Sequence, residues 1–201
     1  MYRGESAYFQ NPNRFLITMS FCGKDEMFFR AWDLEKKDFV KNGFEPKTSS
    51  KKLLKGQFTV PTWVDQDTIL FNPVLHQEEV THSLYPSALY IWKRGEPIEQ
   101  AKKLFEIPKD YILISASKLL SDNIFSSLIF ISADKDFYNY DNYILDTKDE
   151  SLKLQKINMP SDATPEGSFK KYVFWLLHSD WQIKDNNIKQ VHLLPYTTLT
   201  F

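Results

Sequence analysis

Cysteine is nearly absent from this sequence, and neither sign of charge is in clear excess. Cys22 is the only cysteine among 201 residues, so no internal disulfide can form. The 25 basic and 26 acidic residues give a net charge of −1, which excludes a global field that would attract nucleic acid or an anionic membrane. The one basic cluster predicts a solvated loop, with a phosphate-binding patch as the alternative, and consists of Lys47, Lys51, Lys52 and Lys55.

Long apolar runs are missing too. The segment 1–13 lacks the apolar region of a secretory signal, and we expect it to be a flexible N-terminal segment. The run 15–22 (FLITMSFC) is too short to span a bilayer. With the single cysteine, these absences favour a cytoplasmic location and predict neither a membrane nor a nucleic-acid partner.

Glycine is scarce, and its spacing excludes one kind of catalytic site. A nucleophile elbow requires Gly-x-Ser-x-Gly, because the serine must sit on a sharp, strained turn. No two glycines of this chain bracket a serine at that spacing, and no glycine-rich phosphate loop is present. The six glycines are Gly4, Gly23, Gly43, Gly56, Gly95 and Gly167.

Histidine and cysteine give no stronger sign of chemistry. The four histidines are His76, His82, His178 and His192. The stretch HQEEVTH, 76–82, superficially resembles a zinc motif, but its histidines are six residues apart and would face opposite sides of a helix. A polar loop is the better interpretation. Cys22, at the end of an apolar strand, would need a nearby base to act as a nucleophile, so we predict a structural cysteine.

Two carboxylate pairs and one basic aromatic stretch remain. Asp65 with Asp67, and Asp134 with Asp136, have the composition of a glycosidase pair. Both pairs lie in short turns, where aspartate favours local backbone hydrogen bonds. The stretch 90–94 (YIWKR) could stack on single-stranded nucleic acid, but a packed strand is the better interpretation. We therefore predict no catalytic, cofactor-binding or metal-binding residue.

Aromatic residues are abundant, and they favour sheet. The chain has 16 Phe, 10 Tyr and 5 Trp, which pack well on pleated surfaces. Only the stretch 98–106 has helical spacing, and we expect one turn of helix there before a strand. The expected strands are 14–21, 27–33, 38–44, 62–64, 68–71, 88–93, 102–107, 111–117, 125–133, 137–145, 151–157, 170–181 and 189–194.

An internal repeat indicates how these strands are grouped. The segments 30–40, 90–106 and 143–157 each combine an aromatic or apolar strand, a charged turn and a second strand. They recur roughly every fifty to sixty residues, which suits one four-stranded propeller blade. We expect the charged turn to join the outer two strands of each blade. One such sheet cannot bury both faces alone, so wide aromatic side chains should fill the wedge between neighbouring sheets.

The same segments carry a family resemblance. AWDLEKKDFVKNGF (31–44), TWVDQDTILF (62–71), LYPSALYIWKRGEPIEQAKKLFE (84–106) and LLHSDW (176–181) resemble, in order, segments of the propeller domain of the prolyl oligopeptidase family. The resemblance implies a propeller that caps a separate α/β-hydrolase domain and restricts access to short peptides. The catalytic serine, aspartate and histidine of that family lie in the hydrolase domain, so the resemblance assigns no catalytic residue here.

These observations together predict an all-β chain, a partial β-propeller of about three to four four-stranded antiparallel blades. We expect residues 1–201 to form a single domain with no hydrolase domain and no cofactor. We expect the chain to be the non-catalytic, gating portion of a serine-type peptidase. In the parent family the partners of this portion are peptides. The alternative is a free-standing binding module that uses exposed sheet edges. Its partner would be a hydrolase domain or a second copy of the chain.

Overall fold

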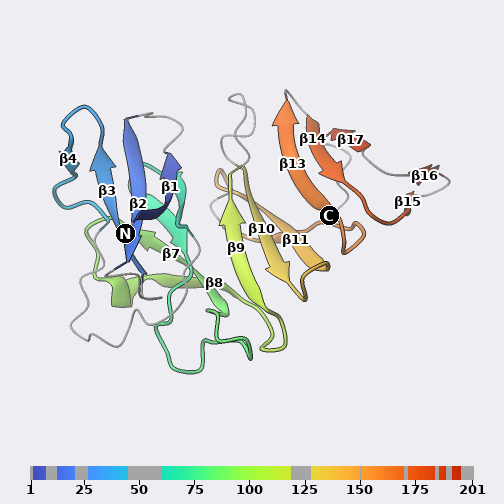
Figure 1. Cartoon of the computed structure of the whole chain (residues 1–201), viewed down its shortest axis with the longest axis horizontal. Helices are drawn as coiled ribbons and strands as arrows, with labels where there is room; N and C mark the ends of the chain where they lie inside the picture. The colour runs from blue at the N-terminus through green and yellow to red at the C-terminus, as the bar shows by residue number, and fades with distance from the viewer. Residues whose placement is uncertain are drawn as a thin grey trace. The chain divides into compact units, whose positions relative to one another are not determined.

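The computed structural model describes residues 2–7, 13–20, 27–44, 60–118, 128–149, 151–169, 172–183, 186–188 and 192–195. The chain divides into two compact units, Met1–Ala116 and Ser117–Phe201. Strands make up nearly all of the regular structure in both units (Figure 1). Within the described ranges, no helix is long and apolar enough to cross a membrane.

The first unit contains two four-stranded sheets, each following the order of the chain. The first sheet is β1 Tyr2–Ala7, β2 Arg14–Ser20, β3 Met27–Asp33 and β4 Asp38–Phe39. The second sheet is β5 Thr62–Asp65, β6 Thr68–Phe71, β7 Ala88–Lys93 and β8 Lys102–Glu106. All neighbouring strands pair antiparallel, as expected of two meanders.

The second unit continues the pattern. β10 Leu128–Asp134, β11 Tyr140–Asp146 and β12 Gln155–Lys156 belong to a four-stranded sheet. The edge strand of this sheet is β9 Leu113–Ser117, in which the chain passes from one unit to the next. A three-stranded sheet follows, with β13 Thr164–Phe169, β14 Tyr172–Leu176 and β17 His192–Pro195. β15 Trp181–Ile183 and β16 Asn186–Ile188 form a separate hairpin.

The charged turns join the outer two strands of the sheets, as the repeat predicts. They connect β3 to β4, β7 to β8 and β11 to β12. In two of them an aspartate at the end of the strand closes the turn, because Asp33 accepts the Lys36 N–H at 3.0 Å and Asp146 accepts the Lys148 N–H at 3.0 Å. In the third, Gly95 adopts a φ of +85°, which a residue without a Cβ tolerates best.

Aromatic rings dominate the core of the first unit. Phe29 of the first sheet meets Trp92 of the second edge to face, at 6.2 Å between ring centroids. Phe44, which follows β4, inserts between Trp63 and Trp92, at 5.5 Å from each ring. Gly43 makes this insertion possible, since a Cβ there would lie 2.9 Å from the Val40 carbonyl oxygen. The wedge between these sheets is thus filled as predicted.

The core of the second unit has fewer rings. Phe130 and Trp175 meet at 5.9 Å, and most of their neighbours are aliphatic. β10 is buried on both faces, because Leu128 and Phe130 face this core while Ile129 and Ile131 on the other face are at most 1% exposed.

Some boundaries differ from the sequence prediction. The structure places β1 inside the segment 1–13, where no strand was expected, and β13 over 164–169. The sequence of β13 contains Pro165 and Gly167, which lower strand propensity. The stretch 170–181 is not one strand, because residues 177–180 leave the ladder between β14 and β15. The predicted helical turn is confirmed as a 3-10 helix, Ile98–Gln100, followed by β8.

Candidate functional site

A buried carboxylate organises the loop between β6 and β7. Glu79 is 0% exposed, and it accepts the hydroxyl of Tyr90 at 2.5 Å. Lys103 on β8 forms an ion pair with it at 2.7 Å. The backbone N–H groups of Leu75 and His76 complete the site, at 3.2 and 3.1 Å. A charge so deeply buried is tolerated because every side of it is paired.

The groups of this cluster have pKa values that are shifted away from neutral pH. Burial alone would raise the pKa of Glu79, but the hydrogen bonds from Lys103, Tyr90 and the backbone of His76 outweigh it and lower that pKa. Burial and the bond to Glu79 raise the pKa of Tyr90, and the bonds to Glu79 and Glu106 raise the pKa of Lys103. A general acid or base works best with a pKa near the operating pH. The arrangement is therefore suited to fixing the loop rather than to transferring protons.

Three polar side chains anchor the backbone at β9. The Thr62 hydroxyl donates to the Ala116 carbonyl at 2.6 Å, and the Thr81 hydroxyl to the Ile112 carbonyl at 2.9 Å. Between them, the Asn72 amide donates to the Ile114 carbonyl at 3.1 Å. The accepting residues are two apart, so their carbonyls point the same way along the strand. These bonds satisfy the carbonyl groups along one edge of β9 and of the residue before it.

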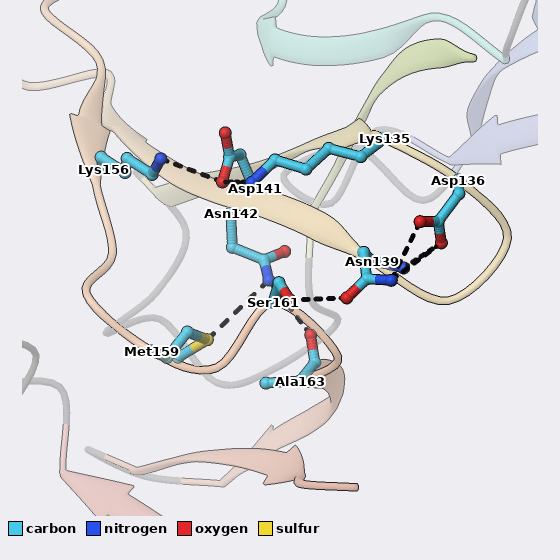
Figure 2. Close-up of polar contacts among 9 residues, drawn as sticks. All are labelled: Lys135, Asp136, Asn139, Asp141, Asn142, Lys156, Met159, Ser161 and Ala163. Carbon is cyan, nitrogen blue, oxygen red and sulfur yellow. Dashed lines mark hydrogen bonds and ion pairs between the residues drawn. The ribbon is translucent and has the colours of Figure 1, made fainter. Parts of the chain in front are cut away.

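In the second unit, an aspartate lies between two lysines (Figure 2). Asp141 of β11 is 8% exposed and contacts Lys135 Nζ at 2.7 Å and Lys156 Nζ at 2.9 Å. The lysines come from the β10–β11 turn and from β12. The two cations thus tie one carboxylate to both of its neighbouring segments, and the arrangement presents no free base.

Amide side chains beside Asp141 hold the loop that leads to β13 (Figure 2). Asn142 donates to the Ala163 carbonyl at 3.1 Å and contacts the Met159 sulfur at 3.8 Å. Ser161 donates its hydroxyl to the Asn139 side-chain oxygen at 2.6 Å. The loop 157–163 is therefore fixed to β11 by neutral hydrogen bonds, whereas the loop at Glu79 is fixed by charge.

The predicted candidates are not brought together. His76, His82 and His178 have exposed side chains in loops. His192 lies in β17. Cys22 and the lysine cluster at 47–55 lie outside the described residues. Among the residues that the structure describes, no group of three His, Cys, Asp or Glu side chains could hold a metal ion.

The aspartate pairs are engaged locally. Asp65 accepts the Asp67 N–H at 2.7 Å, and Asp67 pairs with Arg94. Asp136 accepts the N–H groups of Tyr138 and Asn139, and the first of these bonds contributes most to lowering its pKa. Burial raises the pKa of Asp134, against a hydrogen bond from Ser132.

Sequence reasoning overlooked the buried polar residues. Glu79 lies in HQEEVTH, where attention falls on the histidines, and nothing local distinguishes it from the exposed Glu78. A signal did exist for Asp141 and Asn142, because an adjacent charged and amide pair interrupts the aromatic strand FYNYDNYIL. Polar residues in the middle of such a strand indicate buried hydrogen bonds.

Two relatives match almost the whole chain. An uncharacterized peptidase of Rickettsia prowazekii (strain Madrid E) is 76% identical over 188 residues, which are 94% of this chain and 26% of that protein. A post-proline cleaving enzyme from Rickettsia typhi of known structure is 73% identical with a TM-score of 0.90, over 98% of this chain and 29% of its own. The chain thus spans roughly a quarter of the length of these relatives. No family model matches the chain.

More distant structures share the fold alone. One of two prolyl endopeptidases superposes with a TM-score of 0.63 at 11% identity, over 88% of this chain. The β-propeller domain of the Trilobed protease from Pyrococcus furiosus covers 96% of this chain, with a TM-score of 0.50 at 13% identity. At these identities only the arrangement of strands can be compared.

Proposed function

We propose that this chain is the propeller portion of a prolyl oligopeptidase-type peptidase, because it is similar to a peptidase and to a post-proline cleaving enzyme. Its own role would be steric: it narrows the route by which peptides reach a serine that lies elsewhere. The predicted family and the partial propeller are confirmed. The observation that carries the proposal is coverage, since nearly the whole chain aligns with about a quarter of each peptidase.

The chemistry of the chain supports a role without turnover. The most strongly perturbed cluster keeps Glu79 ionised and Tyr90 and Lys103 protonated at neutral pH. What these groups position is a loop and a sheet. A steric filter needs loops that are held in place, because a filter that opens freely does not select by size.

A hydrolysis assay tests the first half of this proposal. The purified chain is incubated with proline-containing chromogenic peptides and with a serine-directed phosphonate. We expect neither turnover nor labelling. Turnover that co-purifies with the chain and disappears with the phosphonate would show that it carries its own catalytic site.

A chimera tests the steric half. The matching segment of the Rickettsia prowazekii relative is replaced by this chain, with and without Trp92→Ala in the first core. We expect the chimera to prefer short peptides and the variant to cleave long peptides better relative to short ones. An unchanged length preference in a variant with a loosened core would contradict the steric role.

The alternative, a binding module that uses sheet edges, can be argued from the last strand of each larger sheet. β4 and β12 are two residues long, and β8 presents exposed lysines, features that discourage strand addition. β17 is the end strand of its sheet among the described residues. Light scattering after size exclusion separates the two functions, because edge pairing through β17 predicts a concentration-dependent dimer and the steric role predicts none.

A further inference from the structure

A charged pocket lies in the first unit, where β2, β3 and β4 end and the β7–β8 turn approaches. Its volume is about 440 Å³. Register places Arg14, Asp33 and Asp38 side by side at the ends of their strands. The remaining charged side chains of its lining are Lys36, Lys41 and Arg94. None of these residues belongs to the clusters around Glu79 and Asp141.

One arginine in this pocket lacks an acceptor. The Nε of Arg14 is buried, and no hydrogen-bond acceptor reaches it. Asp33 lies directly opposite in the ladder, but its Oδ1 accepts the Lys36 N–H at 3.0 Å. Asp38 likewise turns its Oδ1 to the N–H of Phe39, at 2.7 Å. A buried donor on a charged group without an acceptor is costly, so its persistence calls for an explanation.

On the other side of the pocket, Asp67 holds Arg94 in place. Arg94 donates its Nε to Asp67 at 2.6 Å, and its backbone N–H donates to the Asp67 carbonyl at 2.7 Å. Arg94 is thereby fixed facing the first sheet. Four basic and two acidic side chains line the pocket, so the formal balance of the lining is 4 − 2 = +2. Counting Asp67, the partner of Arg94, leaves +1.

We propose that this pocket binds a small oxyanion, a phosphate or a carboxylate, with Arg14 as its main ligand. A guanidinium presents N–H donors in a planar fork that matches two oxygens of either anion. The anion would supply the acceptor that Arg14 Nε lacks. Lys41 would add charge from the turn after β4, while Lys36, whose Nζ lies 3.9 Å from Asp33 Oδ2, offsets that carboxylate. This site is independent of the steric role proposed above.

Nuclear magnetic resonance of the arginine side chains tests the site on the intact 201-residue chain. Phosphate and acetate are titrated separately, each exchanged for chloride at constant ionic strength. The Arg14 Nε–H signal, assigned by its loss in Arg14→Lys, should shift and saturate with at least one anion. The anion that shifts the signal at the lower concentration shows whether the pocket prefers a phosphate or a carboxylate. A shift that is linear with both anions, or equal for all arginines, would overturn the proposal.

A variant pair supplies the second measurement. Thermal unfolding is followed in the better anion and in chloride. Arg14→Lys keeps the charge but not the fork, and it should weaken the apparent anion affinity by about tenfold. Arg30→Lys is the matched control, since Arg30 is not among the lining residues and reaches the pocket only through the back of Phe39, over whose ring it lies at 4.0 Å. Equal anion stabilisation of both variants would contradict the role of Arg14.

Discussion

The two units of this chain solve the same packing problem with different side chains. In the first, rings from two sheets meet in one core, with Trp92 in contact with Phe29, Phe44 and Phe71. In the second, Phe130 and Trp175 are surrounded mainly by aliphatic residues. Neighbouring sheets of a propeller diverge like a wedge, and rings fill wide space with few rotatable bonds. The two cores therefore reach full burial with different mixtures of aromatic and aliphatic side chains.

The polar contacts differ in the same way. In the first unit, Glu79 fixes a loop through an ion pair and three further hydrogen-bond donors. In the second, Asn142 fixes the loop before β13 through neutral bonds to Ala163 and Met159. The first arrangement depends on protonation and the second does not. Variants can therefore test whether the two units owe their stability to different forces.

Removing the central ring of the first core should have the largest effect. Trp92→Ala deletes contacts to three rings, Phe29, Phe44 and Phe71, and leaves a large cavity. We expect a loss of about 4 to 5 kcal/mol in unfolding free energy, measured by urea denaturation with circular dichroism. Trp175→Ala removes one ring contact, so its loss should be smaller by about 1 kcal/mol. Equal losses would show that ring contacts do not distinguish the cores.

Neutralising the buried carboxylate of Glu79 should cause the second largest loss of unfolding free energy. Glu79→Gln removes the ion pair with Lys103, and we expect a loss of about 2 to 3 kcal/mol at pH 7. Glu106→Gln is the matched control, because Glu106 bonds the same lysine at 2.9 Å while 39% exposed, and it should cost less than about 0.5 kcal/mol. Similar losses for the two variants would contradict the importance of burial at Glu79.

The pH dependence of this effect has a definite sign. The pKa of Glu79 is lowered in the folded chain from its ordinary value of 4.5. Its contribution is therefore complete above pH 4.5 and is lost as the pH falls through the lower folded pKa. The difference between wild type and Glu79→Gln should shrink on acidification. A difference that stays constant down to pH 3 would contradict an ionised Glu79.

Features of the fold and of the candidate site could be predicted from the sequence when they depend on residues that are close together in the chain. The charged outer turns and the aromatic strands are local, and 30–40, 90–106 and 143–157 were placed correctly. β13 was missed because Pro165 and Gly167 hide a strand that sheet pairing stabilises. The contact of Tyr90 and Lys103 with Glu79 joins two strands and a loop, so no spacing in the sequence predicts it. That no residue is catalytic stays a prediction.

Removing the neutral hydrogen bond between Asn142 and the Ala163 carbonyl should cost less unfolding free energy, and the loss should not depend on pH. Asn142→Leu leaves the buried Ala163 carbonyl without its donor, and we expect a loss of about 1 to 2 kcal/mol. Asn158→Leu, at an exposed site in the same loop, serves as the control. The loss should be the same at pH 4 and pH 7, unlike that of Glu79→Gln. A loss that varies with pH would mean that Asn142 acts through a titrating neighbour.

The smallest loss of unfolding free energy is expected when Trp175 is replaced by Phe, because the indole N–H groups of the two buried tryptophans differ in their partners. Trp175 Nε1 is buried without an acceptor, whereas Trp92 Nε1 donates to the Glu96 carbonyl at 2.9 Å. Replacing Trp175 by Phe removes ring area but also an unsatisfied donor, so we expect a change of less than about 1 kcal/mol. Trp92→Phe loses ring area and a hydrogen bond together, and urea denaturation should show a larger loss. If Trp175→Phe were the more damaging change, the indole of Trp175 would have to donate to a partner such as water, and the contrast between the two cores would rest on ring contacts alone.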